Sequence, residues 1–216
     1  MKVFSIPQDV KSLLFDIDNT LYSDDGYYQL QIELLLRRFA EQKKISPADA
    51  REMFEAEKKR YAAENGGKKT STGNIMQAFG ISLEENARWR DELFKPEDFL
   101  SEDGGTVAVF KRLVSSYSIA AVTNNTVGIG RRTLAVLGLA DLIPVIVGLD
   151  TCFVSKPAEE PFEAALQILG CSPHNAVSVG DRYDVDLEIP LAMGMGGVLI
   201  ENLSDLYALP EILLPS

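Results

Sequence analysis

Two aspartates, Asp16 and Asp18, stand one residue apart directly after the apolar run of the stretch "LLFDIDNTLY". Carboxylates can ligate a metal ion, attack an electrophilic centre or transfer a proton. One carboxylate of this pair could attack phosphorus and form an aspartyl-phosphate intermediate, and the other could protonate the leaving group. The pair is therefore the centre of a candidate catalytic site.

Further polar residues stand at or shortly after the ends of other apolar runs: Thr123, Asn124, Lys156, Asp181, Asp184 and Asp186. Several carboxylates in one crevice cannot all stay ionised without a counter-ion. Oxygen ligands without His or Cys favour Mg²⁺, which commonly bridges protein carboxylates and substrate phosphate. The Lys156 ammonium, the Thr123 hydroxyl and the Asn124 amide are donors for anionic oxygens. Together these residues predict a magnesium site that binds a phosphorylated substrate.

The elements that must position these residues alternate between strand and helix. Short runs rich in Val, Ile, Leu and Ala predict strands at 11–15, 118–122, 144–147, 176–179 and 197–200. Helices are predicted between them at 106–115, 129–137, 161–169 and 187–193. This alternation predicts a parallel, doubly wound α/β sheet, in which ligands bind beyond the carboxyl ends of the strands. The candidate site residues follow those ends, so we expect them to meet at one edge of the sheet.

The segment after the first strand has a different, helical periodicity. It predicts four helices within 27–44, 46–65, 70–80 and 82–94 and no strand. Ser46 is a candidate N-cap followed by Pro47, and Ser82 and Glu85 have capping-box spacing. We therefore expect an α/β core at 1–22 and 101–216, with an inserted helical subdomain at 23–100. Its basic residues are interpreted as a solvated helix face: Lys58, Lys59, Arg60, Lys68 and Lys69.

Composition narrows the possible partners and locations. The chain has 216 residues and a net charge of −11, which argues against a nucleic acid as the partner because that binding depends on clustered Lys and Arg. No apolar run is long enough to span a bilayer, and the first residues lack the pattern of a signal peptide. We expect a cytoplasmic protein without a membrane partner. Oligomeric state has no signal in the sequence.

Four short motifs occur in a fixed order along the chain: "DIDNT" from Asp16, "TN" from Thr123, "KP" from Lys156 and "GDRYDVD" from Gly180. This ordered set resembles the four motifs of the haloacid dehalogenase-like (HAD) superfamily of hydrolases. The resemblance implies a Rossmann-like core with a helical cap of the C1 type inserted soon after the first motif. The four predicted helices fall at that position.

The resemblance also implies a role for each matching residue. Asp16 matches the nucleophile and a metal ligand, and Asp18 matches the general acid/base, whose backbone carbonyl also binds the metal. Thr123, with Asn124 beside it, matches the phosphate-binding position. The remaining matches are Lys156, which steadies the phosphoryl group and nucleophile, Asp181, a metal ligand, and Asp186, which orders metal-bound water. Asp184 fits no required position and is a candidate for a place near the metal without contacting it.

Asp18 helps to choose among the reactions of this superfamily. Dehalogenases that resemble this chain lack an aspartate two residues after the nucleophile, since halide needs no protonation, so Asp18 favours phosphoryl transfer. The leading hypothesis is a Mg²⁺-dependent phosphomonoesterase for a small phosphorylated metabolite. The stretch "FDIDNTLY", followed by Gly26 and a long helix, is similar to the pyrimidine 5′-nucleotidase branch, which would make a nucleoside 5′-monophosphate the substrate. A phosphomutase and a non-catalytic protein that binds a phosphorylated metabolite are the alternatives.

Overall fold

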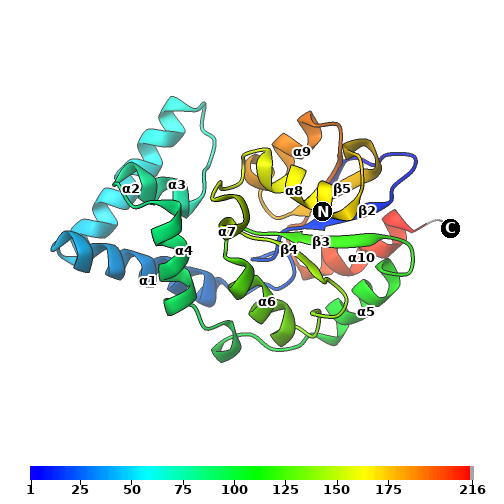
Figure 1. Cartoon of the computed structure of the whole chain (residues 1–216), viewed down its shortest axis with the longest axis horizontal. Helices are drawn as coiled ribbons and strands as arrows, with labels where there is room; N and C mark the ends of the chain where they lie inside the picture. Colours follow the sequence, from blue (N-terminus) through cyan, green and yellow to red (C-terminus); the bar gives the residue numbers. More distant parts are fainter. Residues whose placement is uncertain (215–216) are drawn as a thin grey trace.

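A six-stranded sheet forms the centre of the α/β part of the molecule. The computed structural model describes residues 1–214, and its strands follow the order β1-β6-β5-β2-β3-β4 (Figure 1). Their bounds are Lys2–Ser5 (β1), Ser12–Phe15 (β2), Ser118–Val122 (β3), Val145–Val147 (β4), Ala176–Gly180 (β5) and Gly196–Leu199 (β6). The strands β2 to β6 pair in parallel. The predicted Rossmann-like α/β class is confirmed.

Helices cover both faces of this sheet, which explains why its strands read as continuous apolar runs. Leu13 and Phe15 of β2 belong to one apolar cluster, and Leu14 between them belongs to another. The first cluster includes side chains of α5 (Gly104–Leu113), α6 (Val127–Val136) and α10 (Leu203–Leu213). The second includes α8 (Glu160–Leu169) and α9 (Glu188–Ala192). Successive side chains of a strand point to opposite faces, so the two clusters pack on opposite sides of the sheet.

The structure differs from the sequence prediction in four elements. The strand β1 was not predicted, and it pairs antiparallel with β6, so a wholly parallel sheet was wrong at this edge. The helix α10 was missed because Pro210 stands inside it, and α7 (Leu149–Cys152) is too short to show a period. The helix predicted at 187–193 is a π-helical turn at Tyr183–Leu187 followed by α9.

Four helices lie between β2 and α5, and we call them the four-helix segment. They are α1 (Asp25–Lys43), α2 (Pro47–Glu64), α3 (Thr72–Ala78) and α4 (Leu83–Leu93). Ser46 and Asp49 form a complete capping box at the start of α2, and the Ser82 side chain accepts a hydrogen bond from the Glu85 backbone at the start of α4. The segment has its own apolar cluster, which includes Phe39 and Trp89. It stands beside the α/β part, at the left of Figure 1.

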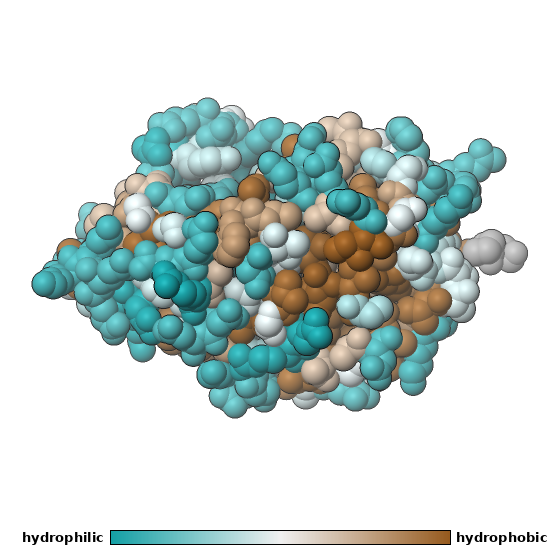
Figure 2. Space-filling model, viewed as in Figure 1, coloured by the Kyte–Doolittle hydropathy of each residue, from teal (hydrophilic) through white to brown (hydrophobic). Residues whose placement is uncertain are grey.

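The surface is hydrophilic over most of the four-helix segment, whereas apolar residues gather over part of the α/β unit in the same view (Figure 2). Within residues 1–214, no helix combines the length and the hydropathy that crossing a bilayer requires.

Candidate active site

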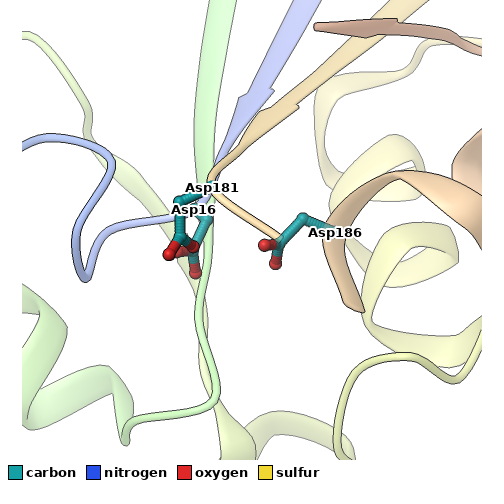
Figure 3. Close-up of side chains that lie close together, drawn as sticks. All are labelled: Asp16, Asp181 and Asp186. Atoms are coloured by element: carbon teal, nitrogen blue, oxygen red, sulfur yellow. The ribbon is translucent and has the colours of Figure 1, made fainter. Parts of the chain in front are cut away.

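The ends of three neighbouring strands bring the predicted site residues together. Asp16 follows β2, Thr123 follows β3 and Asp181 follows β5, and β2 lies between the other two strands in the sheet. Figure 3 shows the carboxylates of Asp16 and Asp181 side by side, with Asp186 reaching toward them from the segment after β5. The pairing register sets this arrangement, because Phe15 at the end of β2 is opposite Ala121 and Val179.

Lys156 is buried at the centre of the site, with 1% of its surface exposed. Its ammonium donates to Asp16 Oδ1 at 2.7 Å, to Asp186 Oδ1 at 2.7 Å and to the Val122 carbonyl at 2.6 Å. These three bonds use all three of its hydrogens. Burial opposes the charged form, but the two carboxylates outweigh it, so the pKa of Lys156 is raised. Lys156 is therefore a fixed positive charge against Asp16.

Asn124 holds the backbone of Lys156. Its side-chain oxygen accepts from the Lys156 N–H at 2.8 Å, and its amide nitrogen donates to the Lys156 carbonyl at 3.2 Å. Both polar atoms of a side chain predicted to bind phosphate are thus engaged in positioning the lysine. The amide nitrogen has a second hydrogen, which can still be donated to a phosphoryl oxygen.

Asp18 has surroundings unlike those of Asp16. The Tyr22 hydroxyl donates to Asp18 Oδ1 at 2.6 Å, and the Asn125 amide donates to Asp18 Oδ2 at 2.9 Å. The Thr123 hydroxyl lies 3.4 Å from the same Oδ2. Asp18 is partly exposed, whereas Asp16 is buried against Lys156. This difference suits two separate roles, one for a fixed carboxylate and one for a carboxyl group that can exchange protons.

The group Asp16, Asp181 and Asp186 fits a divalent cation. One carboxylate oxygen from each lies within 4.8 Å of the others. Burial raises the pKa of Asp16 to about 7 and that of Asp181 to about 6, although Lys156 and Arg182 oppose the shift. Asp181 Oδ1 is buried and accepts no hydrogen bond, although Arg182 Nε lies 3.5 Å from it. An anionic oxygen without a hydrogen bond, placed among other carboxylate oxygens, is one that Mg²⁺ binding would satisfy.

Asp186 is more constrained than the other two acids. Its Oδ1 accepts from Lys156 and its Oδ2 accepts from the Arg182 N–H at 3.0 Å. A Cβ at Gly180 would clash with the Asp186 side chain, so this close approach requires glycine at position 180. With both oxygens engaged, Asp186 is better placed to fix Lys156 and a metal-bound water than to bind the metal directly.

Asp184 lies outside this acidic group and contacts the four-helix segment. Its carboxylate accepts from the Lys69 N–H at 3.1 Å, and nearby the Lys68 ammonium pairs with Glu188 at 2.5 Å. Lys68 and Lys69 belong to the loop between α2 and α3. Two contacts therefore tie this loop to the segment that carries Asp181 and Asp186.

A cavity of about 620 Å³ lies between the four-helix segment and the strand ends. Five cationic side chains line it, against only Glu55 and Asp181: Lys58, Lys59, Lys68, Lys69 and Arg182. The four lysines are exposed, as the sequence predicted, but they also form one wall of this cavity. An excess of positive charge there contrasts with the net charge of −11 of the whole chain.

Sequence reasoning missed several side chains that contact the predicted residues. Tyr22 and Asn125 hydrogen-bond Asp18, and their only signal was proximity to the first two motifs. Arg90 of α4 donates to the Asn125 side chain at 2.6 Å. Nothing in the sequence of α4 indicated that this arginine reaches the strand ends.

Comparisons with known proteins identify the family of the chain. A family model described as haloacid dehalogenase-like hydrolase matches residues 13–200. The chain is 26% identical over 182 residues to pyrophosphatase PpaX of Listeria monocytogenes, which covers 81% of this chain and 76% of that protein. It is 24% identical over 202 residues to glyceraldehyde 3-phosphate phosphatase of Methanothermobacter thermautotrophicus, covering 89% and 86%. The crystal structure of a HAD phosphatase from Thermococcus onnurineus has the same fold, with a TM-score of 0.61, 24% identity and coverage of 95% and 98%.

Proposed function

The chain belongs to the haloacid dehalogenase-like hydrolase family and is a phosphatase of that family. We propose that it is a Mg²⁺-dependent phosphomonoesterase for small phosphorylated metabolites. The observation that carries the proposal is the pairing of a buried Asp16–Lys156 contact with a partly exposed Asp18 two residues away. The first carboxylate is held for attack, and the second is accessible for proton transfer.

In the proposed reaction, Asp16 attacks the substrate phosphorus, and an Asp16–O–P bond forms as the bond to the leaving oxygen breaks. Asp18 gives its proton to that oxygen. The Asp18 carboxylate then takes a proton from water, which attacks phosphorus, releases inorganic phosphate and restores Asp16. The bonds from Tyr22 and Asn125 support this role because they fix the direction in which Asp18 points.

The charges around phosphorus come from several residues in this proposal. Asp16, Asp181 and the backbone carbonyl of Asp18 would hold Mg²⁺, which neutralises phosphoryl oxygens when it is bound. Lys156 holds Asp16 in place through its 2.7 Å bond, and the Thr123 hydroxyl is the donor offered to a phosphoryl oxygen. Asp186 fixes Lys156 from the opposite side.

We further propose that residues 23–100 act as a cap over a core formed by 1–22 and 101–216. The contacts of Lys68 with Glu188 and of Lys69 with Asp184 support this division, since they close the 620 Å³ cavity at one side. A cavity of this size beneath a helical segment suits metabolites rather than phosphoproteins. Its lysines favour anionic substrates by raising their local concentration. Nucleoside 5′-monophosphates are one class that would fit.

The test is phosphate release by the purified protein from p-nitrophenyl phosphate and from a panel of nucleoside monophosphates, sugar phosphates and phosphoglycolate, with and without Mg²⁺. The Asp16→Asn variant is the matched control. Mg²⁺-dependent release is expected. Transfer of the phosphoryl group within a sugar phosphate, without release, would indicate a mutase instead. A protein that binds a metabolite from the panel but turns over none of them would be a binding protein, and the proposal would be wrong.

A further inference from the structure

Arg90 is a buried cation without a carboxylate partner. Only 6% of its surface is exposed, and no acidic side chain of residues 1–214 lies within ion-pair distance of its guanidinium. Its Nε donates to Asn86 Oδ1 at 2.7 Å and its Nη1 to Asn125 Oδ1 at 2.6 Å, both neutral acceptors. Burial lowers the pKa of Arg90 to about 10, and the charge of Asp18 only partly opposes this. A buried charge in this state is costly unless an anion joins it.

A buried amide donor lies beside Arg90. Gln31 of α1 is 6% exposed, and its amide nitrogen lies near the Tyr27 hydroxyl but makes no hydrogen bond of normal geometry. Gln31 and Arg90 line one small cavity of about 40 Å³, together with Asp18, Asn125 and Arg182. The lining therefore contains two cations and one anion. Its donors exceed its acceptors, so it fits a group that is rich in oxygen and negatively charged.

The position of this small cavity relates it to the leaving group. It adjoins Asp18, the proposed proton donor to the leaving oxygen, whereas Asp16 is not part of its lining. It shares Tyr28, Ile32, Thr72 and Arg182 with the lysine-lined cavity, so the two cavities are neighbours with a common wall. A volume of about 40 Å³ corresponds to a few water molecules. A carboxylate fits this space, and a phosphoryl group would fill it.

We propose that Arg90 and Gln31 form a specificity site for an anionic group carried by the leaving group of the substrate. A guanidinium offers paired N–H donors to a carboxylate or phosphoryl group, and the Gln31 amide adds a third donor. The substrate class is then a short phosphomonoester with a second anionic group close to the ester oxygen. The inference rests on the proposed phosphomonoesterase function and adds the chemical class of its substrate.

The inference can be tested by binding alone, without turnover. Phosphonoacetate and isobutylphosphonate have the same shape, but only the first has a carboxylate, and neither has an ester bond to hydrolyse. Titration calorimetry with Mg²⁺ should show that the wild-type protein binds phosphonoacetate more tightly. In Arg90→Met, the affinity for phosphonoacetate should fall about ten- to hundredfold more than the affinity for isobutylphosphonate, the range expected for lost hydrogen bonds to a charged group.

Two further variants make the result specific. Arg88→Met removes an exposed arginine from the same helix and should leave both affinities unchanged. Gln31→Met keeps the side-chain volume and removes an amide nitrogen that makes no hydrogen bond of normal geometry, so it should fold even if Arg90→Met does not. It should weaken phosphonoacetate binding severalfold more than isobutylphosphonate binding.

The losses of affinity for the two phosphonates show which anionic group Arg90 binds. Equal losses for the two phosphonates would mean that Arg90 binds the reacting phosphoryl group or only supports the fold, and the inference would be wrong. Equal wild-type affinity for the two compounds would also overturn it. If phosphonoacetate is preferred but no phosphomonoester is hydrolysed, the specificity site stands and the proposed phosphatase function fails. The two conclusions are therefore tested independently.

Discussion

The ammonium nitrogen of Lys156 lies 2.7 Å from Asp16 Oδ1, across 140 positions of sequence, and both side chains are almost completely buried. The same nitrogen lies 2.7 Å from Asp186 Oδ1. The Lys156 ammonium thus forms ion pairs with two buried carboxylates. Removing Lys156 would leave both buried carboxylates without compensation, which is strongly destabilising, whereas Lys156 would keep Asp186 as a partner if Asp16 lost its charge.

Lys156→Met should therefore reduce both stability and activity. We expect the free energy of unfolding without Mg²⁺ to fall by about 3–5 kcal/mol, because Asp16 and Asp186 would be left without their shared cation. Urea unfolding followed by circular dichroism measures this change. Lys59→Met, at an exposed lysine, is the control and should change stability by less than about 0.5 kcal/mol. A Lys156→Met protein as stable as the wild type would show that the contact contributes nothing to folding.

The strand ends could be predicted from the sequence because burial dictates them. A parallel strand covered on both faces is mostly apolar and carries no charge, so the first charged residue marks the end of β2, as Asp16 does after Phe15. The edge strand β1 was not predicted because its residues are mostly exposed and form no apolar run. The helix α10 was not predicted because Pro210 disfavours a helix. The packing of Leu206 and Leu209 in the core outweighs this local preference.

The residues that come from the four-helix segment could not be predicted. In the sequence, Arg90 is one charged residue among many in α4, and Gln31 is one polar residue in α1. Their burial depends on how these helices pack against the loop after β3, where Asn125 accepts a hydrogen bond from Arg90. The HAD motifs do not cover the four-helix segment, so the side chains proposed to bind the anionic group of the leaving group lie outside them.

Asp16→Asn should abolish turnover, because it removes the attacking carboxylate while nearly preserving its shape. No phosphoenzyme should form when the variant is mixed with substrate and quenched in acid. Folding should be retained, since one of several buried acids loses its charge. Wild-type turnover by a folded Asp16→Asn protein would refute the proposed nucleophile.

Asp18→Asn should slow the reaction by about 10²–10⁴-fold on alkyl phosphates, the usual contribution of a general acid or base. The deficit should shrink for p-nitrophenyl phosphate, whose leaving group needs little protonation. If Asp18 also activates water, phosphoenzyme should accumulate. Steady-state rates on both substrate types and acid trapping measure these effects. Equal deficits on both, without trapped intermediate, would exclude the acid/base role.

Mg²⁺ should stabilise the protein more as pH rises. The pKa values of Asp16 and Asp181 are raised by burial to about 7 and about 6, so the metal-free folded state holds protons that the unfolded state has released. These groups therefore make the metal-free protein less stable as pH rises from about 4 to about 7. Mg²⁺ competes with those protons, and its binding should be stronger above that window than within it.

The measurement is the increase in melting temperature with saturating Mg²⁺, at about pH 8 and at about pH 5.5. The increase should be larger at the higher pH, and Asp181→Asn should reduce it at both. EDTA should abolish activity, Mg²⁺ should restore it, and Ca²⁺ should do so poorly because its longer bonds misalign nucleophile and phosphorus. An increase that does not change with pH, or full activity in excess chelator, would contradict the metal assignment.

Asp184→Ala should affect substrate binding rather than metal binding. Its carboxylate accepts a hydrogen bond from the Lys69 backbone, and the neighbouring Lys68–Glu188 pair makes a second contact between the same two segments. Losing the first contact should let the α2–α3 loop move away from the strand ends and raise KM severalfold, with kcat changed less. Because the contact is partly exposed, the free energy of unfolding should change by less than about 1 kcal/mol.

The melting-temperature increase with Mg²⁺ in Asp184→Ala should match the wild type, since Asp184 lies outside the group of Asp16, Asp181 and Asp186. Among residues 1–214, the cavity lysine Lys58 forms an ion pair only with Glu55 of its own helix. Lys58→Met therefore tests the loss of cavity charge without the loss of the loop contact. If Asp184→Ala instead abolishes the response to Mg²⁺, Asp184 belongs to the metal site, and its contact with Lys69 is secondary.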